Sequence, residues 1–212
     1  MIEFKNVKKD FKGNVLFEDI NITFPMGKKI GIIGTNGSGK SVLMKMIVGY
    51  SNLTQGGIWI DGKLLKKDFD FIPNAGVSIN APEFTGSMSG IDNLLQIAKI
   101  RRIATKTEIY ELARKLNFEN ELKKKYKKYS LGMKQKMRII QALMDKPRYL
   151  ILDEPFDALD AASKVATKKL LEDFISADNM LIFSSHGEEI FDFADRIYSI
   201  EDHHLNEVEA KK

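Results

Sequence analysis

The sequence predicts an α/β domain in which a mostly parallel β-sheet is covered by helices on both faces. Two short segments, Tyr149–Leu152 and Met180–Phe183, are apolar throughout, which is typical of strands buried on both faces. Helical patterns alternate with these segments, as in folds built from strand–helix–strand units. A glycine-rich stretch at residues 34–41 (GTNGSGKS) lies between another apolar segment and a helical one. With 212 residues, the chain suits one such domain with a smaller inserted subdomain.

The N-terminal part predicts half-exposed antiparallel strands followed by a strand and a helix around the glycine-rich stretch. Lys29–Ile33 predicts a short strand, and Ser41–Gly49 predicts a helix that ends at its glycine. Ile58–Ile60 predicts a further strand before a turn. The apolar residues whose rough alternation predicts the antiparallel strands are Ile2, Phe4, Val7, Leu16, Ile20, Ile22 and Phe24.

The middle of the chain, from about residue 91 to 128, changes to a helical pattern. Another helix is expected after Gly132, ending near Pro147. We therefore expect an α-helical subdomain at about 81–146 within a single domain, whose core comprises about 1–80 and 147–201. A frayed tail is expected at about 202–212. The two expected apolar helix faces consist of Leu94, Leu95, Ile97, Ala98 and Ile100, and of Ile109, Leu112, Ala113 and Leu116.

Composition excludes several classes of protein. The absence of Cys excludes disulfides, thiolate metal sites and cysteine nucleophiles. Met1–Asp10 lacks the apolar region of a signal peptide, and no segment approaches the roughly 20 apolar residues that cross a bilayer. The chain is thus expected to be cytosolic, with any membrane role supplied by a partner. A formal charge of +4 is modest, and the lysine cluster within 123–128 is interpreted as solvated surface rather than a nucleic-acid site.

The glycine-rich stretch matches the phosphate-binding pattern G-x-x-x-x-G-K-[ST]. Glycines let backbone N–H groups turn inward around an anion, and the following helix directs its positive end at the phosphates. Lys40 is expected to reach the β- and γ-phosphates, and the Ser41 hydroxyl to bind Mg²⁺. Dinucleotide binding is disfavoured because Val42 would occupy the last glycine position of its G-x-G-x-x-G pattern. The residues expected to bind the phosphates are Gly34, Asn36, Gly37, Ser38, Gly39, Lys40 and Ser41.

Two adjacent acids, Asp153 and Glu154, end the first of the fully apolar segments. Asp153, at the carboxyl end of a strand, is expected to lie beside the phosphate loop and to bind Mg²⁺ directly or through water. Glu154 points elsewhere and is predicted to polarise the attacking water, which favours hydrolysis over transfer to a small-molecule acceptor. The alternative is a pair of acids that merely faces solvent.

Further motifs follow in an order that resembles the ATP-binding-cassette ATPases, the nucleotide-binding subunits of ABC transporters. Residues 129–135 (YSLGMKQ) resemble the family signature, usually written LSGGQ. Residues 158–160 (ALD) resemble its D-loop, and Ser185 with His186 resembles its switch histidine. Phe11 is placed like the aromatic residue that stacks on adenine. The resemblance extends from about residue 2 to 201.

This resemblance implies a P-loop NTPase cassette with a RecA-like parallel sheet core, an N-terminal antiparallel β-subdomain and an inserted α-helical subdomain. It also implies a homodimer that holds two ATP molecules with Mg²⁺ between its subunits. Each ATP would contact one subunit's phosphate loop and the other subunit's Ser130 and Gly132. His186 would sense the γ-phosphate, and Asp160 would order the opposite site. A satisfied histidine at a strand end is the alternative for His186.

The chain departs from the family pattern at two places. Leu131 and Met133 stand where Gly and Gln are usual, but Ser130 and Gly132 remain, so nucleotide binding is expected. Asn80 stands at the Q-loop position, where Gln or Glu is usual. We expect Asn80 to contact Mg²⁺ or water only when the loop closes, so that hydrolysis is slow or partner-dependent. The alternative is that Asn80 is an ordinary turn residue.

Residues 78–84 (SINAPEF) and 130–135 (SLGMKQ) resemble the exporter branch that includes bacitracin- and lantibiotic-immunity ATPases. That resemblance implies an ATP-hydrolysing subunit that powers a separately encoded permease, in a bacterial exporter of a drug, antimicrobial peptide or similar amphiphile. The subunit would lie on the inner face of the cell membrane through the permease. One alternative is a soluble cassette ATPase acting on nucleic acid or ribosomes, although no nucleic-acid partner is expected. Another is a nucleotide-binding subunit that barely hydrolyses ATP.

Overall fold

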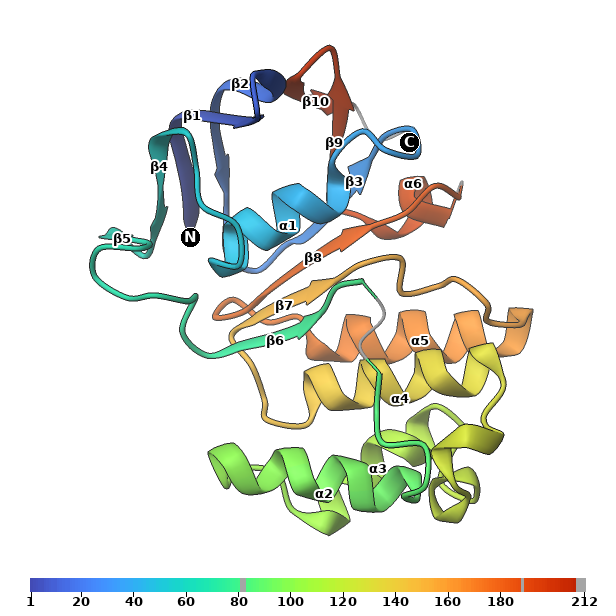
Figure 1. Cartoon of the computed structure of the whole chain (residues 1–212). Helices are drawn as coiled ribbons and strands as arrows, with labels where there is room; N and C mark the ends of the chain where they lie inside the picture. The colour runs from blue at the N-terminus through green and yellow to red at the C-terminus, as the bar shows by residue number, and fades with distance from the viewer. Residues whose placement is uncertain (81–82, 188, 209–212) are drawn as a thin grey trace.

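The computed structural model of the chain describes residues 1–80, 83–187 and 189–208. It contains two β-sheets and a set of helices (Figure 1). The antiparallel sheet has the order β2-β1-β4-β5, from β1 Ile2–Phe11, β2 Asn14–Phe24, β4 Gln55–Ile60 and β5 Lys63–Leu64. The larger sheet has the order β10-β9-β3-β8-β7-β6, from β3 Lys29–Ile33, β6 Ala75–Ser78, β7 Tyr149–Leu152, β8 Met180–Ser184, β9 Arg196–Glu201 and β10 His204–Val208. The helices are α1 Lys40–Val48, α2 Gly90–Arg101, α3 Lys106–Lys115, α4 Leu131–Leu143, α5 Ala161–Phe174 and α6 Glu189–Phe193, with 3-10 turns η1 Glu121–Lys123 and η2 Tyr126–Lys128.

The antiparallel N-terminal strands are confirmed. Strand β1 pairs with β2 on one side and with β4 on the other, so Ile2 lies opposite both Phe24 and Ile60. Alternate residues of β1, such as Ile2 and Phe4, are buried because successive side chains of a strand point to opposite faces.

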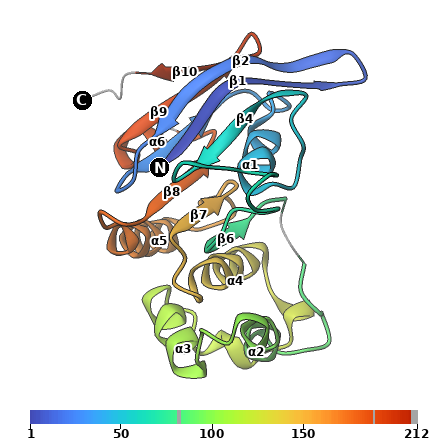
Figure 2. The same ribbon diagram turned by 90° about the vertical axis from the view of Figure 1, so that its left-hand side faces the viewer.

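The covered parallel sheet is also confirmed. Strands β9, β3, β8, β7 and β6 run parallel, and every residue of β7 and β8 is buried. Tyr149 and Ile151 face the cluster that contains α1 and the antiparallel sheet, whereas Leu150 and Leu152 face the cluster of α2 to α5. Helix α1 therefore lies between the two sheets, and α4 and α5 lie across β7 with α2 and α3 beyond them (Figures 1 and 2). No helix in the described ranges is both long and apolar enough to cross a membrane.

The predicted helices of the middle segment are present, each with a clear start. The Ser89 side chain caps α2, and Thr105 with Glu108 forms a capping box at the start of α3. One detail of the predicted apolar face is wrong, because Ile100 is 80% exposed. The reason is geometric: Ile100 lies about 200° around the helix from the buried Ala98. The expected start of the helical subdomain, near residue 81, lies outside the described residues.

The predicted frayed tail is wrong for residues 204–208. These residues form β10, which pairs antiparallel with β9 and places Leu205 opposite Ile200. The connecting turn is also held, because the backbone N–H of Glu18 donates to the carbonyl of His203 at 2.9 Å. The strand forms because Leu205 is buried and its neighbours complete the sheet edge. Residues 209–212 of the expected tail lie outside the described residues.

Candidate functional site

The phosphate loop joins the carboxyl end of β3 to the N-terminus of α1. Gly39 caps the helix at φ +108°, where a Cβ would lie 2.9 Å from the ring of Phe17, so the position requires glycine. The Lys40 side chain is buried, and its ammonium donates hydrogen bonds to the carbonyls of Gly34 at 2.7 Å and Thr35 at 3.2 Å. The loop thus wraps around the Lys40 ammonium group.

The loop fits a nucleotide polyphosphate. The hydroxyl of Ser38 is buried and has no hydrogen-bond partner among the described residues, and a Cβ on Gly34 would lie 2.5 Å from it. A buried unpaired hydroxyl is costly unless a ligand completes it. The first N–H groups of α1 and the Lys40 ammonium supply further donors and positive potential at the same place. The loop thus offers hydrogen-bond donors and positive potential to a phosphate chain.

Asp153, at the end of β7, is held between two hydroxyl groups. Ser41 Oγ on α1 donates to one carboxylate oxygen at 2.7 Å, and Ser184 Oγ on β8 donates to the other at 2.6 Å. The structure thus brings together two of the residues that the sequence predicts as Mg²⁺ ligands, Ser41 and Asp153. Hydroxyl and carboxylate oxygens at the phosphate loop fit Mg²⁺, which prefers oxygen ligands and keeps part of its water shell. A bound Mg²⁺ would neutralise charge on the phosphates.

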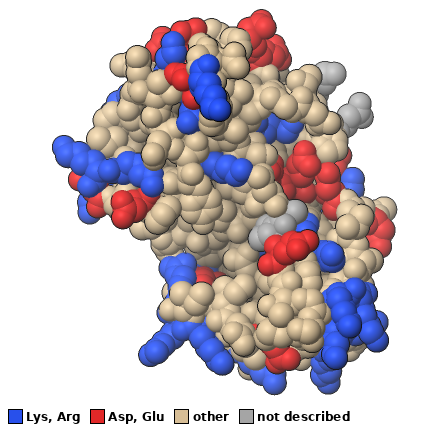
Figure 3. All heavy atoms as spheres, in the orientation of Figure 1, with Lys and Arg blue, Asp and Glu red and all other residues tan. Residues whose placement is uncertain are grey.

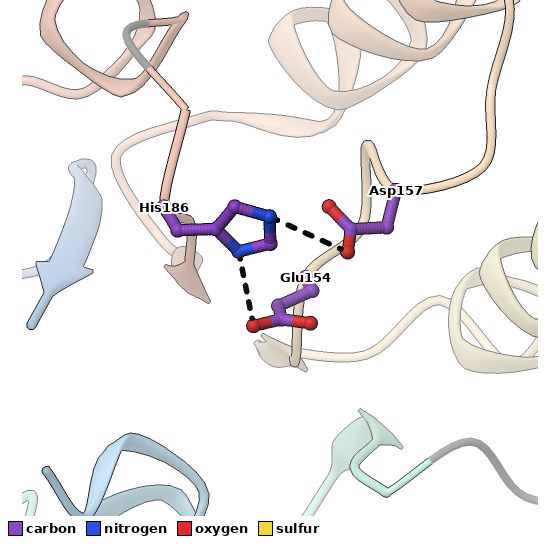
Figure 4. A group of neighbouring side chains, drawn as sticks. All are labelled: Glu154, Asp157 and His186. Carbon is purple, nitrogen blue, oxygen red and sulfur yellow. Dashed lines mark hydrogen bonds and ion pairs between the residues drawn. The ribbon is translucent and has the colours of Figure 1, made fainter. Parts of the chain in front are cut away.

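Glu154 and His186 approach one another from the ends of β7 and β8. His186 Nδ1 lies 3.2 Å from Glu154 Oε1, and Nε2 lies 3.8 Å from Asp157 Oδ2 (Figure 4). The ring therefore lies between two carboxylates, and the three residues could also surround a cation. Glu154 has a backbone φ of +50°, an uncommon conformation for a residue with a side chain. Its N–H donates to Ser184 Oγ at 2.9 Å.

Asp157 is a site residue that the sequence analysis did not identify. Burial raises the pKa of its carboxyl group, and the negative charge of Glu154 raises it further. Glu154 has a left-handed backbone, and the Asp157 N–H donates a hydrogen bond to the Glu154 carbonyl at 3.2 Å, so a tight turn brings Asp157 back towards Glu154. The sequence signal that points to Asp157 is its position three residues after Glu154, within the same turn.

A cavity of about 270 Å³ lies beside these carboxylates. Asn80 reaches it from the end of β6, so the structure places the predicted Q-loop residue close to Asp153 and Glu154. Asn80 has φ +55°, which is compatible with a turn residue as well. The other lining residues include Leu131, Gln135 and Arg138 of α4, which the sequence analysis did not assign to the site.

The predicted signature residues lie at the start of α4. The Ser130 side chain caps the helix by accepting the N–H of Met133 at 3.2 Å. Gly132 packs so tightly that a Cβ would lie 2.7 Å from the carbonyl of Ala158. Among the described residues, no hydrogen bond joins Ser130 or Gly132 to the phosphate loop of the same chain. Their contact with ATP stays a prediction.

The remaining predicted residues lie farther from the carboxylates. Asp160 caps α5 by accepting the N–H of Ser163 at 2.7 Å, and this hydrogen bond lowers the pKa of its carboxyl group. The Phe11 ring, at the end of β1, is half exposed, with the Lys9 ammonium 4.3 Å from its centre. An exposed ring of this kind is available for stacking on a base.

The phosphate loop, the acidic strand end and the neighbouring histidine together define the class of protein, a nucleotide-hydrolysing cassette built on a parallel sheet. The sequence profile of the ABC transporter family matches residues 17–157. The ABC transporter ATP-binding protein YybJ of Bacillus subtilis is 34% identical over 92% of this chain and 90% of its own length. The chain therefore belongs to the ABC transporter family, as one of its ATP-binding, ATP-hydrolysing subunits.

Two further relatives carry names that describe transport. The lantibiotic transport ATP-binding protein SrtF of Streptococcus pyogenes is 32% identical, over 93% of this chain and 87% of its own length. The bacitracin transport ATP-binding protein BcrA of Enterococcus faecalis is 32% identical, over 98% of this chain and 68% of its own length.

The fold is that of known ATP-binding cassettes. A dimeric ATP-binding cassette, solved in a post-hydrolysis state with ADP and phosphate, superposes with a TM-score of 0.86. The match covers 100% of both chains at 21% sequence identity. This likeness confirms the predicted cassette fold, with its antiparallel β-subdomain, parallel core and helical subdomain.

Proposed function

We propose that this chain is the ATPase subunit of a bacterial ABC exporter and that it powers a separately encoded membrane permease. ATP and Mg²⁺ bind at the phosphate loop, with Ser41, Asp153 and Asn80 around the metal and Phe11 on the adenine. Glu154 activates the attacking water, and His186 contacts the γ-phosphate. The observation that carries this proposal is the convergence of Asp153, Glu154 and His186 at adjacent strand ends, beside Ser41 of the loop.

The proposed subunit works as a homodimer. Ser130 and Gly132 lie at the positive N-terminus of α4, and among the described residues no hydrogen bond joins them to their own phosphate loop, which supports contact with an ATP held by a second copy. Asp160 lies in the same region and would order the opposite site. ATP binding closes the dimer, and hydrolysis reopens it. The permease would hold the dimer at the inner face of the cell membrane and change conformation with each cycle.

The exported cargo is proposed to be an antimicrobial peptide, a drug or a similar amphiphile. Support comes from the names of two relatives, one a lantibiotic and the other a bacitracin transport ATP-binding protein.

The proposed subunit has two parts. These are an ATP-binding core at about 1–80 and 147–201 and a helical subdomain at about 81–146.

Co-purification tests the proposed function. The tagged chain is expressed in its native cells, membranes are solubilised in mild detergent, and the bound proteins are identified. A stoichiometric membrane protein with several spans is expected, and its ATPase-linked transport can then be assayed with bacitracin or a lantibiotic. Recovery of ribosomes or nucleic acid without a membrane protein would contradict the proposal.

The surface charge does not favour the alternative of a nucleic-acid partner. On the face shown in Figure 3, basic side chains gather in several separate groups with acidic ones among them, rather than in one continuous patch.

A further inference from the structure

Gln135 is a buried polar residue on α4, and its side-chain amide links the helix to the backbone of Glu154. Gln135 is only 7% exposed, and its Nε2 donates a hydrogen bond to the Glu154 carbonyl at 3.1 Å. On its other side, Oε1 accepts a hydrogen bond from Arg138 Nη1 at 3.3 Å. A guanidinium can only donate and a carbonyl can only accept, so the two neighbours determine which way the amide faces.

The backbone of Glu154 needs such support. Its φ of +50° is unfavourable for a residue with a Cβ and persists only where the surroundings hold it. Ser184 on β8 accepts the Glu154 N–H at 2.9 Å, and Gln135 on α4 donates to the Glu154 carbonyl. Side chains from two different elements therefore hold the two peptide groups that flank the Glu154 side chain. The carboxylate that faces His186 takes its direction from this backbone.

We propose that Gln135 is a positioning residue for catalysis, which makes the direction of the Glu154 carboxylate depend on the position of α4. Ser130 caps the start of the same helix, and Gly132 in its first turn packs directly against the carbonyl of Ala158 in the segment after Glu154. In the homodimer of the proposed function, on which this inference rests, the start of α4 contacts the partner's ATP. A shift of α4 upon that contact is transmitted by Gln135 to Glu154, little more than one helical turn away.

Substitution of Gln135 by Met tests this positioning role, because Met has a similar length and no hydrogen-bonding amide. We expect Gln135→Met to lower kcat about tenfold, as expected for loss of a contact that matters in the transition state. The Kd for ATP should change less than about twofold, since the phosphate loop is untouched. Gln141→Met, near the other end of the same helix, is the matched control and should leave kcat unchanged.

Two more variants separate positioning from simple loss of packing. Gln135→Glu keeps the size and an acceptor for Arg138 but places an oxygen against the Glu154 carbonyl, so it should lower kcat at least as much as Gln135→Met. Arg138→Met should lower kcat less.

Wild-type turnover with an unchanged kcat in Gln135→Met would overturn the inference and leave the proposed function intact. A parallel fall in kcat, ATP affinity and thermal midpoint would also overturn it, since that pattern indicates a merely structural residue. Absence of ATP turnover in the wild-type dimer and in its permease complex would contradict the proposed function itself.

Discussion

Nδ1 of His186 lies 3.2 Å from Oε1 of Glu154, so the proposed γ-phosphate sensor and the proposed general base are in direct contact. The other ring nitrogen faces Asp157 at 3.8 Å. Both nitrogens of the ring are thus directed at carboxylates. A γ-phosphate contact by His186 would compete with these partners, so the ring links the proposed phosphate contact to Glu154.

His186→Ala removes this contact and the proposed γ-phosphate ligand. We expect kcat for ATP hydrolysis to fall roughly a hundredfold, in the range for a positioned acid–base group, while ATP still binds. Steady-state phosphate release and nucleotide binding measure the two effects. His204→Ala on β10 is the control, because that exposed side chain contacts the Glu18 carbonyl and lies outside the site. Equal activity of the two variants would exclude a catalytic role for His186.

Ser184→Ala tests the hydroxyl that joins Asp153 to Glu154. It donates to the Asp153 carboxylate and accepts the Glu154 N–H, and the residue is fully buried. Its loss leaves a buried N–H and a carboxylate oxygen without a partner, so we expect a loss of about 1–3 kcal/mol in the free energy of unfolding. Urea denaturation measures this loss. Ser199→Ala, at another buried serine of the same sheet, is the comparison, and an equal loss in both variants would argue against a special role for Ser184.

Gly76→Ala tests the packing that places the end of β6, and with it Asn80, against α4. A Cβ at Gly76 would lie 1.8 Å from the backbone carbonyl oxygen of Ala142, which cannot move without shifting the helix. We expect a loss of about 3 kcal/mol or more in unfolding free energy, at the upper end for overpacking. At Gly86 the nearest atom would lie at 3.5 Å, so Gly86→Ala should change stability by less than about 0.5 kcal/mol. Similar stabilities of the two variants, measured by thermal or urea denaturation, would contradict the packing of β6 on α4.

Stability below neutral pH should depend on Glu108 at the start of α3. The hydrogen bond from Lys146, together with those from Thr105, lowers the pKa of this carboxyl group to about 2 from its ordinary value of 4.5. Because the folded state favours the carboxylate, the stabilisation is complete above the ordinary pKa and is lost as the pH falls towards 2. The wild type should therefore lose more unfolding free energy than Glu108→Gln between about pH 5 and pH 3. Parallel pH profiles in urea denaturation would show that the contact does not contribute.

Local patterns in the sequence predict the elements that meet at the site. The apolar runs of β7 and β8 are readable because they are buried on both faces, and the phosphate loop because its glycines and Lys40 have fixed spacing. Both kinds of signal lie within a few neighbouring residues. Strand β10 was missed because a single buried residue, Leu205, is too weak a pattern, and its pairing with β9 is visible only in the fold.

The contacts that refine the site could not be predicted in the same way. Gln135 lies 19 residues before Glu154 in sequence and reaches it only because α4 packs against the turn after β7. Asp157 meets His186 because Glu154 is left-handed and the Asp157 N–H donates to its carbonyl at 3.2 Å, which closes the turn after β7. Both contacts depend on tertiary packing, and only the position of Asp157, three residues after Glu154, gives a local hint of one of them in the sequence.

ATP turnover by the purified wild type, Lys40→Ala and Glu154→Gln, with the mass of each protein measured in Mg²⁺ and ATP, tests the proposed chemistry most directly. The wild type should release phosphate, and Lys40→Ala should neither bind nor hydrolyse ATP, because the loop loses its only buried cation among the described residues 34–41. Glu154→Gln should bind ATP, lose at least about a hundredfold in turnover and accumulate as an ATP-bound dimer. Turnover by Glu154→Gln at the wild-type rate would show that Glu154 is not the base and that hydrolysis proceeds elsewhere.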